Sequence, residues 1–474
     1  MDKKFEFFGY NATTDGRYSV GGVEYFYGED FRNVKRYKEY KDCGMTMLLL
    51  QGRNSYQGQC DFKKSDCYKC MSNAYKAGID RVIVSDQRLK DLCVIENLIG
   101  ENGKFKSQQE LIEYLKDCVK FYSKEPNFYG LQLFDEPTIQ KLKSYGQVIK
   151  ALKTILPNVY LECNLLPMGG MNFAVSGGDD LPEKFEKYLN EWADQTGMDS
   201  ICFDDYAFLR EYILGVFTLR SYQIAAKVCK ERGLTLGGIM QSFSLFSKEH
   251  LIHRRVTEPD MYWQMNLAMG FGAREFGFFT YMVKQDIPFM ELGGISENDD
   301  RGRLPMRAFG YPYGDGTCDA STFIAKDGSR TKLYYYTKRI MKEMQAFAPV
   351  IFKYNYNRDF VIFEKGKGQN DFMQTKNAIC NGGCPLKITP SYGVILVTEL
   401  KNGEDKLYMV ENISNIKEEY FNGRPAVRAK ITLGEDMKNV SVYFRGKKIE
   451  KKIENGTFYQ SLHAGDAIFI EIKK

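Results

Sequence analysis

Two adjacent acids, Asp135 and Glu136, stand between a short apolar run and Pro137. The run covers residues 129–134 and has the length and composition of a parallel strand that is buried on both faces. Because proline has no N–H group to give to a strand ladder, the strand should end before it. A carboxyl group at the end of a rigid strand suits acid–base chemistry, including protonation of the leaving oxygen of a glycoside. The same tripeptide also fits an ordinary turn whose acids cap the next helix.

Polar side chains recur at or just after the ends of other apolar runs. They are Tyr10, Asn11, Gln51, Asp86, Asn164, Asp204, Asp205, Tyr206, Gln241, Thr280 and Tyr281. Glu162 lies two residues before Asn164, on the same face of its run, and is a further candidate acid. Solvated loops alone would not place amides, acids and tyrosines so regularly after buried strands. The pattern predicts a polar ligand site where the carboxyl ends of parallel strands meet.

Eight strands are predicted to position these residues, at 5–11, 44–51, 81–87, 129–135, 159–166, 200–206, 236–243 and 275–281. Amphipathic stretches between them predict helices, for example at 108–123, 184–192, 219–232 and 261–269. Thr257 is the expected N-cap of the last of these, and Gly233 is expected to end the third. Strands that alternate with helices indicate a parallel α/β fold, and eight of them indicate a (β/α)8 TIM barrel over residues 1–348.

The pattern changes after residue 350 to alternation of period two with frequent turns. Asn-Gly pairs at 402–403 and 455–456 are typical of hairpins. We therefore expect an antiparallel β-sandwich over residues 349–474, either structural or involved in assembling a homo-oligomer. Between the two domains, a final helix is predicted at 332–347. Residues 282–325 form a long insertion, rich in Gly, Pro and Asp, that should lie over the barrel mouth.

The composition of the chain limits the kinds of partner that we expect it to bind. The 474 residues are 43% hydrophobic and 27% charged, as in soluble globular proteins. A net charge of +5 arises from 66 basic and 61 acidic residues without a basic arm, which argues against nucleic acid. No apolar run has the length of a membrane span or a secretory leader, so we expect a cytoplasmic protein without membrane association.

The sequence offers few residues that could bind a metal ion or support histidine-based catalysis. Cys60, Cys67 and Cys70 form one loose cluster that lacks a fourth ligand for zinc. The three histidines are His250, His253 and His463, and the first two are expected at the solvated start of a helix. A histidine metal centre or a Ser-His-Asp triad is thus not expected. We predict neither a metal nor an organic cofactor.

Three stretches resemble barrel glycoside hydrolases of the bacterial β-galactosidase and β-N-acetylhexosaminidase groups. They are Gly-Leu-Gln-Leu-Phe-Asp-Glu-Pro at 130–137, Met-Tyr-Trp-Gln-Met-Asn-Leu-Ala-Met-Gly-Phe-Gly-Ala at 261–273, and Lys-Asp-Gly-Ser-Arg-Thr-Lys-Leu-Tyr-Tyr-Tyr at 326–336. With the sandwich after the last of them, the resemblance covers nearly the whole chain. It implies a glycoside hydrolase that acts on small oligosaccharides or glycosides.

Within this resemblance, Glu136 takes the role of general acid/base on strand four. Retaining enzymes of the clan place a glutamate nucleophile on strand seven, where this chain has Gln241. One alternative is a second carboxylate from strand six. An Asp-Tyr pair there resembles the related enzymes and favours Asp205, since only one of Asp204 and Asp205 can face the interior. The other alternative is substrate assistance, in which Asp135 orients an acetamido group of the sugar.

Six side chains are expected to contact the sugar by hydrogen bonding or stacking: Tyr10, Gln51, Asn164, Tyr206, Gln241 and Tyr281. A spacing of about 5 Å between the two carboxyls would mean retention, and about 6.5–9.5 Å inversion. Two other functions stay open. One is a non-catalytic carbohydrate-binding barrel. The other is a lyase or aldolase, for which no strand end offers a lysine or a phosphate loop.

Overall fold

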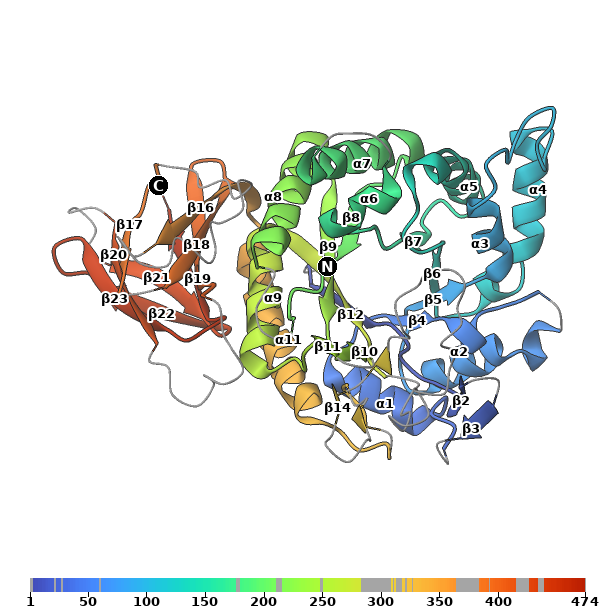
Figure 1. Ribbon diagram of the computed structural model, residues 1–474, viewed down its shortest axis with the longest axis horizontal. Helices are drawn as coiled ribbons and strands as arrows, with labels where there is room; N and C mark the ends of the chain where they lie inside the picture. The colour runs from blue at the N-terminus through green and yellow to red at the C-terminus, as the bar shows by residue number, and fades with distance from the viewer. Residues whose placement is uncertain are drawn as a thin grey trace.

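The computed structural model describes residues 3–473 except 21–22, 27–28, 59–60, 176–179, 210–214, 248–249, 283–307, 310, 313–317, 320–321, 326, 364–382, 392, 415–425 and 434–438. The chain forms two parallel sheets wrapped by helices and then two antiparallel sheets (Figure 1). Most of the predicted insertion at 282–325 lies outside the described residues, as does Cys60.

The parallel sheets contain all eight predicted strands. One sheet has the order β1 (Glu6–Gly9), β12 (Ala273–Phe279), β9 (Thr235–Gln241), β8 (Ser200–Asp204). The other has the order β4 (Leu48–Leu50), β5 (Val82–Ser85), β6 (Phe128–Gln132), β7 (Tyr160–Glu162). Most strands are shorter than predicted, because the polar residues at their carboxyl ends lie in turns beyond the last ladder bond.

Backbone hydrogen bonds link the two parallel sheets on both sides. The Thr46 and Met47 N–H groups, just before β4, donate to the Phe7 carbonyl of β1 at 2.8 and 3.1 Å. On the other side, the Leu165 N–H, just after β7, donates to the Cys202 carbonyl of β8 at 2.8 Å. The polar residues that follow neighbouring strands are therefore held close to one another.

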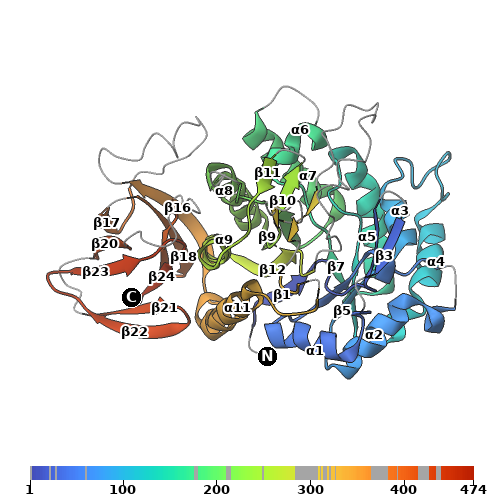
Figure 2. The same ribbon diagram turned by 60° about the horizontal axis from the view of Figure 1, so that its bottom comes forward.

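Helices cover the outer faces of both parallel sheets (Figures 1 and 2). They are α1 (Val34–Cys43), α2 (Asp66–Lys76), α3 (Gln87–Cys93), α4 (Gln108–Val119), α5 (Leu142–Ile155), α6 (Met171–Ala174), α7 (Leu181–Thr196), α8 (Gly215–Arg232), α9 (Glu258–Gly270) and α11 (Lys332–Ile351). The predicted helices are thus present as α4, α7, α8, α9 and α11. Gly233, with φ +69°, follows α8 as expected.

Short strands occupy several connections: β2 (Arg17–Val20), β3 (Val23–Phe26), β10 (Leu245–Ser247), β11 (His250–His253), β13 (Ala308–Phe309), β14 (Tyr311–Pro312) and β15 (Cys318–Asp319). β11 pairs with β10 in antiparallel fashion. The helix start predicted at His250 and His253 is therefore wrong, because the segment is held in a hairpin.

The entry to α9 shows how local sequence fixes an element. The Thr257 N–H donates to the Asp260 carboxylate at 2.9 Å, which caps the first turn as predicted. Asp260 also accepts hydrogen bonds of 2.5 and 2.7 Å from Arg254, and both side chains of this ion pair are buried. Removing either partner would leave a buried charge without compensation. The pair therefore anchors α9, and with it the start of β12.

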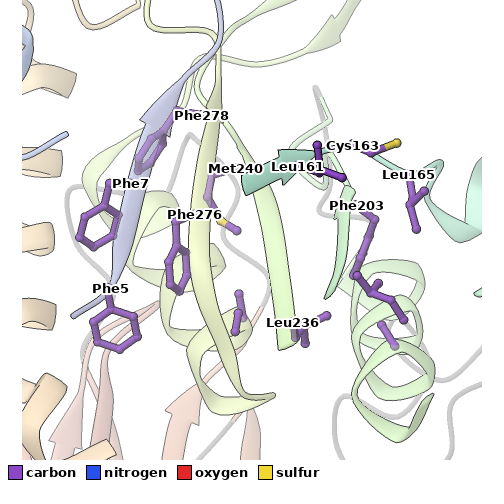
Figure 3. Close-up of a cluster of buried hydrophobic side chains, with 14 of the residues drawn as sticks. Phe5, Phe7, Leu161, Cys163, Leu165, Phe203, Leu236, Met240, Phe276 and Phe278 are labelled. Atoms are coloured by element: carbon purple, nitrogen blue, oxygen red, sulfur yellow. The ribbon is translucent and has the colours of Figure 1, made fainter. Parts of the chain in front are cut away.

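Side chains alternate between the two faces of the parallel sheets. On the outer face, Phe5, Phe7, Phe276 and Phe278 pack beneath the helices (Figure 3). The Phe276 ring lies 5.7 Å from those of Phe5 and Phe7, and burying each such ring contributes roughly 1.5–3 kcal/mol. The inner face carries a smaller, separate cluster: Phe8, Tyr10, Met47, Leu49, Ile83, Cys202 and Ile239.

The C-terminal part contains two antiparallel sheets. One has the order β16 (Asn355–Phe363), β18 (Val394–Asn402), β19 (Asp405–Asn412), β24 (Ala467–Ile472), β21 (Asn439–Phe444), β22 (Lys447–Lys452). The other has the order β17 (Lys387–Pro390), β20 (Val427–Thr432), β23 (Thr457–Leu462). Side chains from both sheets meet in one buried cluster. The opposite face of the larger sheet packs on α9 and α11, where the rings of Phe347 and Phe469 are 4.5 Å apart.

Candidate active site

Three carboxyl groups come together at the carboxyl ends of β6 and β8. Asp135 and Glu136 follow β6 closely, and Asp204 is the last residue of β8. Their charges act on one another. Asp135 raises the pKa of Glu136, and Glu136 and Asp135 both raise the pKa of Asp204. An acid from another strand thus joins the adjacent pair that the sequence displays.

Burial is the main cause of the raised pKa of all three groups. Asp204 is 5% exposed, and desolvation, followed by the charges of Glu136 and Asp135, holds its pKa well above the usual range. Asp135 and Glu136 are open to solvent on one side, but protein surrounds them on the others, and this desolvation raises the pKa of each. Asp204 and Glu136 therefore act on each other's pKa: the charge of Glu136 raises that of Asp204, and hydrogen bonding from Asp204 lowers that of Glu136.

The backbone at Glu136 is held in an uncommon conformation. Its φ is +49°, in the left-handed region that residues other than glycine rarely adopt. The Glu136 N–H donates to the Asn164 carbonyl at 2.9 Å, and the Tyr145 hydroxyl donates to the Phe134 carbonyl. A left-handed residue costs of order 1–3 kcal/mol and persists where its surroundings fix it. These bonds therefore set the direction of the Glu136 side chain.

Five buried polar atoms at the carboxyl ends of β5, β6, β7 and β8 have no hydrogen-bond partner in the described part of the chain. They are Ser85 Oγ, Gln132 Nε2, Glu162 Oε2, Asn164 Oδ1 and Asp204 Oδ1. They lie in or just after β5, β6, β7 and β8, which are consecutive strands. Nearly all buried polar atoms in folded proteins are paired, so such a group marks a place where water or a ligand supplies the partners.

A second polar group adjoins the carboxyls. The Tyr10 hydroxyl donates to Glu162 Oε1 at 2.6 Å, and burial raises the pKa of Glu162 to about 8. Lys90 Nζ donates to Gln132 Oε1 at 2.9 Å, and burial lowers the pKa of this lysine. The positive charge of Lys90 in turn lowers the pKa of Asp135 and of Glu162. Among the described residues, Lys90 is thus a basic group that acts on two of the four carboxyl groups of the site.

The choice of Asp205 over Asp204 as the residue that faces Glu136 is wrong. Asp205 accepts hydrogen bonds from Thr218 Oγ1 at 2.7 Å and Ser221 Oγ at 2.9 Å, both on α8. Desolvation raises its pKa to about 6, with these two bonds acting against the rise. Its side chain therefore points outward to the helix layer. Asp204 takes the inner face because it shares the alternation of Cys202, which lies in the inner cluster.

The Gln241 side chain also makes its hydrogen bonds away from the carboxyl groups. Its Oε1 accepts from the Phe208 N–H at 3.0 Å, and its Nε2 donates to the carbonyls of Phe208, Phe243 and Arg254 at 3.3–3.4 Å. The side chain is fully buried. The predicted contact with a sugar is therefore corrected, because Gln241 instead holds together the loops that follow β8 and β9.

Tyr281 does not reach the carboxyl groups either. Its ring packs against Tyr40 of α1 at 4.9 Å and against Phe323 at 5.2 Å. It is 2% exposed and lies in the outer hydrophobic cluster. The chain turns outward after β12, so the predicted sugar contact of Tyr281 is corrected as well.

Asn164 and Tyr206 lie at the site, whereas the one contact of Gln51 described below is with the residue that follows Tyr10. Asn164 and Tyr206 lower the pKa of Asp204 through hydrogen bonding, and Asn164 does the same for Asp135. The Tyr206 ring stacks on Phe279 at 5.8 Å. Gln51 is half-buried, and its Oε1 accepts from the Asn11 N–H at 3.4 Å.

Sequence reasoning did not select Lys90 and Gln132, and it ranked Asp204 second. Gln132 was visible as the one polar side chain within the run before Asp135. Lys90 lies in α3, a few residues past β5, so it could be found only by looking beyond the strand end. Lys90 therefore corrects the expectation that no lysine lies near the strand ends, which had argued against a lyase or aldolase.

Within the described ranges, no group of three or more His, Cys, Asp and Glu side chains is arranged to hold a metal ion. No described helix combines the length and apolar composition of a membrane span.

Comparison with known proteins places the chain by its fold. No family model and no curated protein matches the sequence. A glycoside hydrolase family 5 structure from Bacteroides vulgatus is 13% identical, with a TM-score of 0.50 over 99% of this chain and 88% of that one. An α-amylase from Geobacillus thermoleovorans, in complex with acarbose, is 12% identical, with a TM-score of 0.52 over 99% of this chain and 98% of that one. At this identity the likeness shows a shared fold.

Proposed function

We propose that this protein is a glycoside hydrolase with Glu136 as general acid/base and Asp204 as the second carboxylate. The observation that carries the proposal is that Glu136 and Asp204 come together where five buried polar atoms, Asp204 Oδ1 among them, have no partner in the described part of the chain. Cleavage of a glycosidic bond needs one protonated and one ionised carboxyl group facing the same bond. Unpaired amide, hydroxyl and carboxyl atoms suit a ligand that is rich in hydroxyl groups.

The proposal includes an architecture. We infer that the two parallel sheets form one (β/α)8 barrel over residues 1–348, followed by a β-sandwich over residues 349–474. Alternation of strands and helices and the hydrogen bonds on both sides of the two sheets support the barrel. The buried cluster between the antiparallel sheets supports the sandwich.

In the proposed reaction, Glu136 donates its proton to the glycosidic oxygen as the bond to the anomeric carbon breaks. Glu136 suits this role because it is the solvent-accessible member of the pair. For this step the proton that burial keeps on Asp204 must first pass to Glu136, which leaves Asp204 ionised. Asp204 then attacks the anomeric carbon and forms a glycosyl ester. Glu136 then removes a proton from water, which hydrolyses the ester and restores both carboxyls. Hydrogen bonding between the two carboxyls favours this retaining course, since inversion needs a gap of at least about 6.5 Å for a water molecule.

Substrate assistance is the alternative for the attacking group. Asp135 would then orient an acetamido group of the sugar, whose oxygen attacks the anomeric carbon while Glu136 still donates the proton. Hydrogen bonding from Asn164 and the charge of Lys90 both act to keep Asp135 ionised, as this role requires. The two routes differ in the sugar they accept, because only the second demands an N-acetyl group.

The test is a panel of nitrophenyl glycosides, with galactosides and N-acetylhexosaminides included, run on wild type, Asp204→Asn and Asp135→Asn. Cleavage of one galactoside-type substrate that Asp204→Asn abolishes supports the retaining route. An N-acetyl requirement with loss in Asp135→Asn supports substrate assistance. Glycan binding without cleavage, equal in all three proteins, would instead identify a carbohydrate-binding barrel and refute the hydrolase.

A further inference from the structure

A cleft of about 730 Å³ lies at the amino-terminal ends of β9 and β12. Its walls come from the end of α8, the turns that precede β9 and β12, and the residues that join α11 to β16. This is the opposite end of the parallel strands from Asp135, Glu136 and Asp204. The volume lies in the range of small-molecule sites, and the proposed reaction does not use the cleft.

The charge of the cleft has one sign. Lys3, Lys230, Arg274 and Lys401 line it, and no carboxylate does among the described residues. The nearest acids lie behind the lining. Asp359 and Glu471 accept from the hydroxyls of Tyr356 and Tyr354 at 2.7 and 2.9 Å, and Glu399 lies 3.9 Å from Lys401 Nζ. The cleft therefore presents a net positive field to a small ligand.

Arg274 is the unusual member of this group. Its guanidinium donates to the carbonyls of Ala273, Ile351 and Tyr354 at 3.0, 3.3 and 3.1 Å. Within the described part of the chain, no carboxylate lies within 4 Å of it. Burial lowers its pKa to about 10, and no acid acts against that shift. Three of its five N–H groups are thus used, and two are left for a ligand.

Lys230 is the second anchor. Its Nζ donates to the backbone and side-chain oxygens of Asn357, both at 2.9 Å, so one of its three N–H groups remains. Aromatic side chains form the apolar wall: the rings of Phe271 and Tyr356 lie 5.4 Å apart, and Phe352 lies under Arg274 at 5.1 Å. Such a wall suits the flat face of a sugar or other ring.

We propose that this cleft binds a small anionic ligand, a carboxylate or phosphate carried on a ring, with Arg274 and Lys230 as the anion-binding side chains. The anion supplies the counter-charge that the buried guanidinium lacks. The two unused Arg274 N–H groups, one on Nε and one on Nη1, can each donate a charge-assisted hydrogen bond.

The test is calorimetric titration of the full-length protein with glucose 6-phosphate, glucuronate and glucose. Three variants accompany the wild type: Arg274→Gln, Lys230→Met and the control Lys227→Met. Lys227 lies one turn before Lys230 on the same exposed side of α8, but it pairs with Glu186 at 2.6 Å outside the cleft. Lys230 is exposed, so its variant remains decisive if Arg274→Gln does not fold.

Loss of one charge-assisted hydrogen bond weakens binding by about 10- to 100-fold. We expect glucose 6-phosphate or glucuronate to bind wild type and Lys227→Met alike, and Lys230→Met and Arg274→Gln at least about tenfold more weakly. The tighter of the two ligands identifies the anion as phosphate or carboxylate. Absence of binding by both anions, glucose binding as tightly as they do, or equal affinity in all variants would overturn the proposal. Equal affinity in all variants is the result expected if the sugar binds only at the carboxyl ends of the strands.

Discussion

Asp204 and Asp205 are neighbours in sequence, yet Asp204 faces the candidate site and Asp205 faces the helix layer. Replacing each in turn by asparagine should therefore affect activity and stability in opposite ways. Asp204→Asn replaces a desolvated carboxyl, whose Oδ1 has no partner among the described residues, by a neutral side chain of the same shape. Its removal should leave the free energy of unfolding unchanged or raise it, because no buried charge is left unpaired. The variant should lose at least about 100-fold in kcat/KM, the lower range for loss of an acid–base group.

Asp205→Asn should show the reverse. At pH 7.5 the Asp205 carboxylate is ionised and accepts two hydrogen bonds from α8, at 2.7 and 2.9 Å. An amide keeps one acceptor oxygen, so one bond to a charged group is lost, which costs about 1.5–3 kcal/mol. Activity should stay within about threefold, since the side chain points away from Glu136.

The assay combines kcat/KM on whichever glycoside the wild type cleaves with urea unfolding of both variants at pH 7.5. Circular dichroism confirms that each variant is folded before its activity is compared. A folded Asp205→Asn protein without activity, beside an active Asp204→Asn protein, would refute the assignment of the inner face to Asp204.

Three further predictions concern groups around the site and the domain junction. Gln241→Glu should not create a nucleophile, and it should lower the free energy of unfolding by about 2–4 kcal/mol, because a carboxylate would face three backbone carbonyls. An active variant that is as stable as the wild type would contradict this. If the substrate-assisted route operates, Lys90→Met should move the acid limb of the kcat/KM profile to higher pH, because the lysine lowers the pKa of Asp135 and that route needs Asp135 ionised. An unmoved limb would exclude Asp135 as the group that sets it. Glu411, between the C-terminal sheet and α9, is buried with both carboxyl oxygens unpaired among the described residues, and desolvation raises its pKa. The stability of the wild type should therefore fall as pH rises above the unfolded value near 4.3, and Glu411→Gln should be the more stable protein at pH 8.5 by thermal unfolding.

The strands were predictable because their signals are local. The run before Asp135 is apolar and short, which predicts β6, although the strand ends at Gln132, well before Pro137. The tight turn after Glu454, which leads from one sheet of the sandwich to the other, was predictable for a similar reason. Asn455 and Gly456 adopt φ values of +50° and +69°, and few other residue pairs tolerate that turn.

Which face of a sheet each side chain occupies was less predictable, because it depends on partners that are distant in sequence. Ile201, Cys202 and Phe203 are all apolar, so the strand that leads to Asp204 has no alternation from which the inner face could be identified. Gln241 looks like a ligand-binding amide until the loops after β8 and β9 fold over it and use all of its polar atoms. Lys90 reaches Gln132, 42 positions away in the chain, only because α3 and β6 are packed together.

The central claim is that Glu136 protonates the leaving group while Asp204 attacks, and leaving-group dependence tests it most directly. Dinitrophenolate departs without protonation, whereas phenolate needs an acid. We measure kcat/KM for dinitrophenyl and phenyl glycosides of the cleaved sugar with wild type, Glu136→Gln and Asp204→Asn. The account predicts that Glu136→Gln loses at least about 100-fold on the phenyl glycoside and far less on the dinitrophenyl one, while Asp204→Asn loses both equally. Equal losses on both substrates in Glu136→Gln, or no loss, would contradict the account.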